Sequence, residues 1–313
     1  MMKPKQIIAE AWTITKKEKR IRQWGFASTL LETLLEAKLV FWQVHFAYTY
    51  FTTGEVVQFF EIEEILYRAL PFWLFLTIII LFILMVVIEF FLPKMCLGAI
   101  IGLSAKAYRK EELRGGLVLA LYNFWPIFAI REIFVFSNIT TTITIISLVL
   151  RYGGTGDFKY TAVGLVVFFW ALSNILKFLA SFGEEAIVIR KMGIFGAIGH
   201  SFKLIISYLS HVIFLILLLI MISLRILMNA LMIFLIPSIA IGLGLLLTSF
   251  LPPVISYSLT TIISILLFFV FSYFLAYLHV FKQTVWTITY LELSQKKELD
   301  IILEENQQTA PIA

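Results

Sequence analysis

The sequence predicts an all-α integral membrane protein, a bundle of about six transmembrane helices with three amphipathic helices on its cytoplasmic face. Hydrophobic residues make up 60% of the 313 positions and charged residues only 14%, whereas a soluble domain carries about 25% charged residues. Apolar runs such as Pro71–Leu92 and Leu259–Leu278 reach the roughly 20 residues that cross a hydrocarbon core as a helix. Most of the chain is therefore expected to lie in a membrane.

Six apolar segments are long enough to cross, and polar connections separate them. Residues 1–23 are expected to form a basic amphipathic helix, 24–282 the membrane bundle and 283–313 a cytoplasmic tail of the same single domain. No polar stretch approaches the roughly 50 residues that an independent soluble domain needs. The predicted spans are Trp24–Tyr50, Leu70–Leu92, Ile127–Leu150, Tyr160–Phe182, Leu204–Leu227 and Tyr257–Phe281.

The basic residues predict the orientation. In the six-span arrangement, one side holds 18 Lys and Arg residues and the other holds 3. Cytoplasmic connections carry an excess of such residues, so both termini are expected in the cytoplasm. The same rule accounts for the net charge of +5, which is therefore no sign of nucleic-acid binding. The polar, basic N-terminus lacks the pattern of a cleavable signal peptide.

One segment leaves the number of spans open. Residues 204–250 are largely apolar and would form a helix of about 70 Å, more than twice the thickness of the hydrocarbon core. Arg225, Asn229 and Pro237 interrupt this segment. The chain either crosses once and then re-enters, giving six spans, or forms a hairpin, giving seven. We prefer six spans, which require a cavity near residues 228–250, because re-entrant backbone must be surrounded by protein or line a water-filled space.

A threefold pattern recurs along the chain. An amphipathic stretch precedes each outward-going span, and a similar cytoplasmic element follows each returning span. The unit would be an amphipathic helix plus a transmembrane hairpin, and repeats of this kind often form a site at their mutual interface. The stretches are Ile7–Arg22, Leu113–Phe124 and Phe195–Ile206, and the following elements are Gly98–Glu112, Glu184–Gly193 and Thr284–Glu298.

Three motifs resemble a known group of proteins. Residues 11–26 contain Ala-Trp, Lys-Lys and Trp-Gly-Phe, residues 194–203 read Ile-Phe-Gly-Ala-Ile-Gly-His-Ser-Phe-Lys, and residues 290–293 read Tyr-Leu-Glu-Leu. This pattern resembles uncharacterised bacterial membrane proteins and the membrane domain that precedes some glycerophosphodiester phosphodiesterases. Phe202 stands where that group usually has Trp. The resemblance implies a six-span bundle in the bacterial cytoplasmic membrane, but no activity, because the catalytic barrel is absent.

Ionisable residues inside the predicted spans are the candidate ligand-binding residues, because charge is costly in the hydrocarbon core. Glu32 and Glu36 are four residues apart and share a helix face, with Lys38 close by. Arg131 and Glu132 follow Trp125-Pro126, and Glu132 could pair with Lys38. One interpretation is a polar cleft for a ligand. The alternative is a set of interfacial charges at the rim of the bundle.

Other basic residues are candidates for contact with lipid headgroups, or for snorkelling toward the interface. Glycines at 98 and 102, and at 193, 196 and 199, predict close helix packing instead of chemistry. The headgroup candidates are Lys16, Lys17, Lys19, Arg20, His200, Lys203 and Arg225.

The sequence contains no familiar catalytic or phosphate-binding motif. Cys96 is the only cysteine, so no disulfide and no cysteine metal site are expected, and neither is a cofactor. We therefore expect a non-enzymatic protein in contact with membrane lipids that binds or passes a small or lipidic solute through a polar cleft. The alternative is a membrane scaffold or assembly factor that acts through its basic amphipathic helices. The solute, any protein partner and the oligomeric state stay open.

Overall fold

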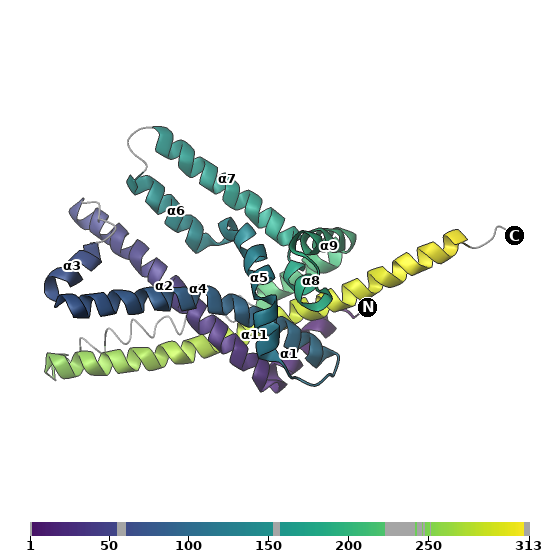
Figure 1. The fold of residues 1–313 in the computed structure, drawn as a ribbon, viewed down its shortest axis with the longest axis horizontal. Helices are drawn as coiled ribbons and strands as arrows, with labels where there is room; N and C mark the ends of the chain where they lie inside the picture. Colours follow the sequence, from purple (N-terminus) through teal and green to yellow (C-terminus); the bar gives the residue numbers. More distant parts are fainter. Residues whose placement is uncertain are drawn as a thin grey trace.

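The structure is a computed structural model that describes residues 2–54, 61–152, 157–222 and 252–309, together with 242, 246 and 248–250. This part of the chain is all-helical and contains no strand, as the sequence predicts. Figure 1 shows the helices packed along one long axis. They are α1 (Pro4–Lys17), α2 (Lys19–Thr53), α3 (Glu61–Ala69), α4 (Phe72–Tyr108), α5 (Gly116–Ile133), the short 3-10 turn η1 (Val135–Ser137), α6 (Ile139–Tyr152), α7 (Asp157–Leu179), α8 (Gly183–Arg190), α9 (Ile194–Ser207), the helix Leu209–Ile222 and α11 (Pro253–Thr309).

Several helices are long and apolar enough to cross a membrane. Among the described residues they are α4, α5 and the Phe158–Leu179 part of α7, with a fourth span if α9 and the bent helix that follows it cross together. In the most apolar stretch of α4 only 6% of the residues are buried by protein. So much exposed apolar surface is unfavourable in water and favourable against lipid. The fold therefore has the character of a membrane protein.

The third predicted span, Ile127–Leu150, is wrong as a continuous helix. Helix α5 ends at Ile133, η1 follows, and α6 begins at Ile139. The amphipathic stretch Leu113–Phe124 does not stand apart, because most of it is the first half of α5. At the break, the Asn138 side chain accepts hydrogen bonds from the backbone N–H groups of Thr140 (2.8 Å) and Thr141 (3.3 Å). Asn138 thereby satisfies amide groups that the first turn of a helix leaves free.

Two further breaks divide predicted helices. The N-terminal amphipathic stretch is interrupted at Glu18, where the extended backbone (φ −90°, ψ 93°) separates α1 from α2. The predicted fifth span, Leu204–Leu227, is interrupted after Ser207, where α9 and the helix Leu209–Ile222 meet at 93°. By contrast, α2 and α11 continue unbroken through the first and last predicted spans.

The buried core lies at one end of the bundle, where α4, α8 and α11 meet α1, α5 and α9. Side chains from Leu97 to Leu103 on α4 are almost completely buried there, and so are most of those from Val285 to Leu293 on α11, with Trp286 and Glu292 partly exposed. Ser104 and Thr284 share a hydrogen bond of 3.1 Å across the interface between α4 and α11. Residues just beyond 282 thus belong to the core of the protein.

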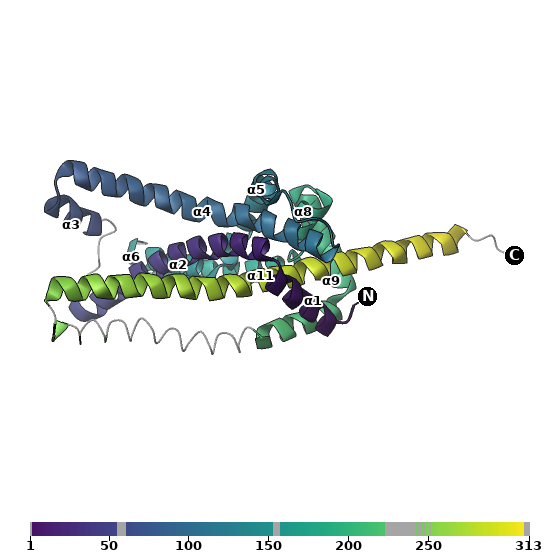
Figure 2. The same ribbon diagram turned by 90° about the horizontal axis from the view of Figure 1, so that it is seen from below.

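Helix α1 places its apolar face against protein. Ile7 and Ala11 are fully buried and pack in a cluster with Val280, Phe281 and Leu215. Figure 2 shows α1 crossing α11. The apolar face of this amphipathic helix therefore packs on protein.

The glycine spacings have two different outcomes. A Cβ atom at Gly98 would lie 3.0 Å from the Leu119 carbonyl oxygen, and one at Gly102 would lie 2.7 Å from the Leu119 side chain. These two glycines allow the close approach of α4 and α5 that the sequence predicts. Among the described residues, no atom lies within 4 Å of such a position at the glycines 193, 196 and 199, so this part of the chain shows no close packing there. The residues that decide between six and seven spans lie almost entirely outside the described part of the chain. The same is true of the cavity expected near 228–250.

Candidate functional site

A polar cavity of about 400 Å³ lies where the helix breaks meet. Its wall includes Phe134 to Asn138 at the α5–α6 break and Ala180 to Ser181 at the α7–α8 break, with side chains from α2, α4 and α11. Irregular backbone inside a membrane protein is tolerated where it lines such a space. The charged residues of the wall are Glu32, Glu36, Glu89, Lys94, Arg131, Glu132, Lys177, Glu184 and Glu185.

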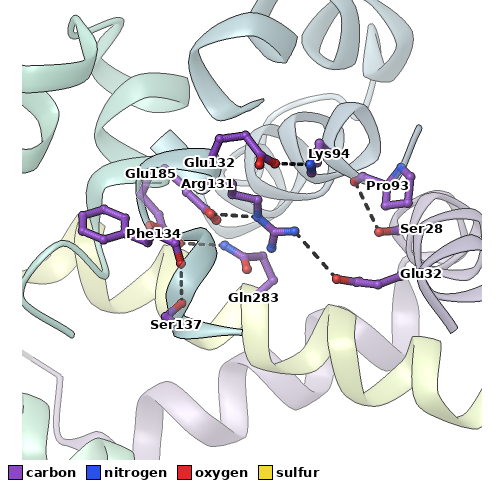
Figure 3. Close-up of polar contacts among 11 residues, drawn as sticks. Ser28, Glu32, Pro93, Lys94, Arg131, Glu132, Phe134, Ser137, Glu185 and Gln283 are labelled. Atoms are coloured by element: carbon purple, nitrogen blue, oxygen red, sulfur yellow. Dashed lines mark hydrogen bonds and ion pairs between the residues drawn. The ribbon is translucent and has the colours of Figure 1, made fainter. Parts of the chain in front are cut away.

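Arg131 joins three helices at this cavity. Its Nε donates a hydrogen bond of 3.0 Å to Glu184 on α8, and its Nη1 lies 3.9 Å from a carboxylate oxygen of Glu32 on α2. Figure 3 shows the guanidinium between these elements. The Arg131 side chain is 29% exposed, so it keeps access to the cavity. Its planar fork of donors can also hold a carboxylate or phosphate group.

Two lysine–glutamate pairs hold α4 to its neighbours. Lys38 Nζ of α2 donates to both carboxylate oxygens of Glu89 at 2.8 and 2.7 Å. Lys94 is paired with Glu132 and lies 3.5 Å from the centre of the Phe90 ring. The expected pairing of Lys38 with Glu132 is therefore wrong, because Lys38 is paired with Glu89 and Glu132 is paired with Lys94.

Glu185 and Gln283 form the inner wall. Glu185 is only 1% exposed, and its Oε1 accepts a hydrogen bond of 2.7 Å from Gln283 Nε2. Among the described residues, its Oε2 has no partner. Burial, reinforced by the negative charge of Glu184, raises the pKa of Glu185 well above its ordinary value of 4.5. This carboxyl group therefore favours its protonated form.

The backbone around the α7–α8 break is held by Ser201 of α9. Its hydroxyl donates to the Leu179 carbonyl at 2.8 Å and accepts from the Phe182 N–H at 3.0 Å. The backbone carbonyl and N–H groups that the break leaves without helical partners are thus hydrogen-bonded. The hydroxyl is fully buried and fixes the position of Glu184 and Glu185 in the following turn.

Most of the predicted ligand-binding residues come together. Glu32, Glu36, Arg131 and Glu132 all line the cavity, and Lys38 touches it through Glu89. Lys94, Glu184, Glu185 and Gln283 also line the cavity, although they are not among the residues predicted from the sequence. An acidic pair at the start of a helix is common in globular proteins, since it complements the helix dipole. The pair at 184–185 therefore carried no distinctive signal, and neither did Gln283.

The predicted headgroup-contact residues lie elsewhere. Lys16, Lys17, Lys19 and Arg20 are exposed near the α1–α2 break, and Arg20 donates a hydrogen bond to the Leu113 carbonyl. Lys203 is exposed and His200 is half-buried on α9, while Arg225 lies outside the described residues.

Within the part of the chain that the structure describes, no three His, Cys, Asp or Glu side chains converge as a metal site would require. The charged and amide side chains of the cavity wall can form ion pairs and hydrogen bonds with a ligand. Comparisons with protein-family models, with curated proteins and with solved structures give no match.

Proposed function

We propose that this protein is a multi-pass protein of the bacterial cytoplasmic membrane that binds, and passes, a small or lipidic solute at the cavity around Arg131. The observation that carries the proposal is the cavity itself, with charged side chains from five helices gathered at two helix breaks. Discontinuous helices around a polar site are the usual construction of solute sites in membrane transporters. Charge in apolar helices is costly, which argues for a role beyond packing.

We further propose six spans, cytoplasmic termini and a threefold arrangement. A helix precedes a break three times: the amphipathic α1 before Glu18, the more uniformly apolar α5 before η1, and the amphipathic α9 before the 93° bend. Each break leads into the next helix toward the opposite end of the bundle. The excess of basic residues in alternate connections supports the orientation. The motifs shared with the uncharacterised bacterial group support membership of that group.

Mass spectrometry of the protein extracted in native-lipid discs tests the proposed function. We expect a lipid or metabolite in stoichiometric amount with the wild-type protein and its loss from Glu36→Gln, a cavity variant. Glu112→Gln is the matched control, since Glu112 is exposed and lies outside the cavity wall. If every small molecule stays bound at wild-type levels in Glu36→Gln, solute binding at this cavity is wrong.

A scaffold role is the second candidate, and the exposed bases at the α1–α2 break favour it. The apolar face of α1 is buried on α11, which leaves Lys16, Lys17, Lys19 and Arg20 presented outward. A scaffold would retain a stoichiometric protein partner in the same discs. It would lose that partner when the four bases are neutralised, and keep it in Glu36→Gln.

A further inference from the structure

Glu185 is a buried side chain in the cavity wall with an unsatisfied hydrogen-bonding atom. Gln283 satisfies Oε1, whereas Oε2 has no partner among the described residues. A buried polar atom left without a partner costs about 1–3 kcal/mol, and such atoms in native structures call for an explanation. Because Glu185 lines the cavity, a group that enters the cavity can complete its bonding.

The charge of the cavity wall indicates the sign of that group. Six carboxylates line the cavity against three bases, Lys94, Arg131 and Lys177. Lys94 is paired with Glu132, and Arg131 is shared between Glu184 and Glu32. Glu36 and Glu185 have no Lys or Arg nitrogen within 4 Å in the described part of the chain. A cleft with such an excess of one charge concentrates ions of the opposite sign.

The rest of the wall indicates a ligand with an apolar body. Phe90, Phe134 and Trp286 line the cavity together with Leu35, Leu39 and Ile130. Aromatic faces attract cations within about 6 Å. A cavity of about 400 Å³ lies in the usual size range of small-molecule sites, which combine apolar walls with a few placed polar groups.

We propose that the cavity binds a hydrophobic organic ammonium ion, whose N–H group donates to Glu185 Oε2 while its apolar body lies against the aromatic side chains. This inference rests on the proposed function and names the class of its solute.

Binding of such an ion would release a proton. The empty site favours the protonated carboxyl, since burial and Glu184 raise the pKa of Glu185 well above 4.5. An arriving ammonium ion supplies the missing positive charge. The carboxyl O–H then gives its proton to water, and the carboxylate accepts a hydrogen bond from the ammonium group. One cation enters and one proton leaves, so the charge of the site is unchanged.

The groups around Glu185 come from each helix packed on α8. Arg131 on α5 stabilises the ionised form, whereas Tyr290 on α11 interacts with the same carboxyl. Lys94 on α4 lines the same cavity, and His200 on α9 lies against the Tyr290 ring. Gln283 donates to either form of the carboxyl. Glu185 is the carboxyl among them that is both buried and without a basic partner.

Calorimetry on the purified full chain in lipid nanodiscs tests the inference with three related probes. They share a phenylethyl body and differ in the polar group and its size: 2-phenylethylammonium, neutral 2-phenylethanol and anionic 3-phenylpropionate. A primary alkylammonium titrates near pH 10, as lysine does, so it stays charged between pH 5 and 8. We expect the cation to bind at least tenfold more tightly than either other probe. Titration in two buffers of different ionisation enthalpy should show one proton released per cation bound.

The pH dependence and the variants make the test specific. Below the pKa of Glu185, linkage predicts that the cation affinity rises by up to about tenfold for each pH unit. Glu185→Gln should bind more weakly and release no proton, whereas Glu185→Asp, which retains a carboxyl group, should still release one. Glu112→Gln should behave as wild type. Proton release that persists in Glu185→Gln, or equal binding of the cation and the alcohol, would overturn the inference.

The remaining outcomes separate this inference from the proposed function. Preferred binding of 3-phenylpropionate would show a solute site of the opposite class, so the ammonium inference would fail and the proposed function would stand. If none of the three probes binds, the ammonium inference also fails. The native-lipid discs then decide the proposed function independently.

Discussion

At the scale of single residues, the Lys38–Glu89 pair is the most enclosed ion pair in the described structure. The Glu89 side chain is fully buried, and that of Lys38 is 31% exposed. Removing one partner of a buried pair leaves an uncompensated charge, which costs more than the pair itself contributes. The two residues therefore act together in fixing α2 against α4.

A double-mutant cycle checks this pair. We expect Lys38→Met alone to lower the free energy of unfolding by about 2 kcal/mol, and Lys38→Met with Glu89→Gln to recover part of the loss. Thermal unfolding in detergent measures both changes. The exposed Glu64–Arg68 pair is the control, and its removal should cost under about 1 kcal/mol. Additive effects of the two substitutions would show that Lys38 and Glu89 are not coupled.

Glu185 gives the stability a pH dependence that needs no ligand. The native pKa is raised above 4.5 by burial, so above that pH the unfolded chain loses this proton while the folded chain keeps it. Stability therefore falls as pH rises, by up to about 1.4 kcal/mol for each pH unit, until the native carboxyl ionises. Below pH 4.5 both states hold the proton, and this contribution is complete.

Glu185→Gln removes this contribution. We expect the melting temperature of Glu185→Gln to rise relative to that of the wild type between pH 5 and pH 8, for as long as the native carboxyl stays protonated, as measured by differential scanning fluorimetry. Glu112→Gln should follow the wild type throughout. A constant difference between Glu185→Gln and wild type over this range would contradict the assignment.

At the scale of helices, some glycines lie against a neighbouring helix and others do not. A Cβ at Gly98 would press on the Leu119 backbone and on Ile127, whereas Gly196 has open space. We expect Gly98→Ala to destabilise the protein by about 1–3 kcal/mol, as overpacking does. Gly196→Ala should be neutral or stabilising by up to about 1 kcal/mol, because alanine favours the helix. Unfolding in detergent compares the two, and equal effects would contradict the packing of α4 on α5.

Hydrophobic composition identified the helices but not where they break. The run from Ile127 to Leu150 stays apolar across the turn at Phe134 to Asn138, so hydropathy shows no boundary there. Asn138 is a favoured cap residue, and its position after the Arg131-Glu132 pair was the available signal. The 93° bend after Ser207 likewise falls in an apolar run, and the helix that precedes it, α9, packs on α8.

The sequence indicates some of the residues that line the cavity but not others. Glu32, Glu36, Arg131 and Glu132 stand out because they interrupt apolar spans. Glu184 and Glu185 follow a span in a polar stretch, where acidic residues are ordinary. Only the packing of α8 against α5 and α11 turns them inward, and sequence spacing within one helix carries no information about that contact.

At the scale of the whole molecule, apolar side chains face outward along one end of the bundle and inward at the other. Ile80 on α4 and Leu165 on α7 are 56% and 54% exposed, whereas α4 residues near Ile100 are completely buried. The end of the bundle with outward-facing apolar side chains is therefore suited to contact with lipid.

Spin labels test this division. Nitroxides at Ile80→Cys or Leu165→Cys should collide more with oxygen, which dissolves in lipid, than with a water-soluble nickel chelate. A label at Glu112→Cys should show the reverse. The native Cys96 is 1% exposed and should not react in the folded protein. Chelate access at Ile80 equal to that at Glu112 would contradict a lipid environment for α4.

Helix α11 is one continuous rod of 57 residues, about 85 Å long at 1.5 Å per residue. It contributes Gln283 to the cavity and continues for about 40 Å beyond that residue. A tilt of about 5° around Gln283 would displace the far end of the rod by about 3 Å, because a straight helix transmits rotation along its length. Any rotation of the helix at the cavity would therefore appear as a larger displacement at its C-terminal end.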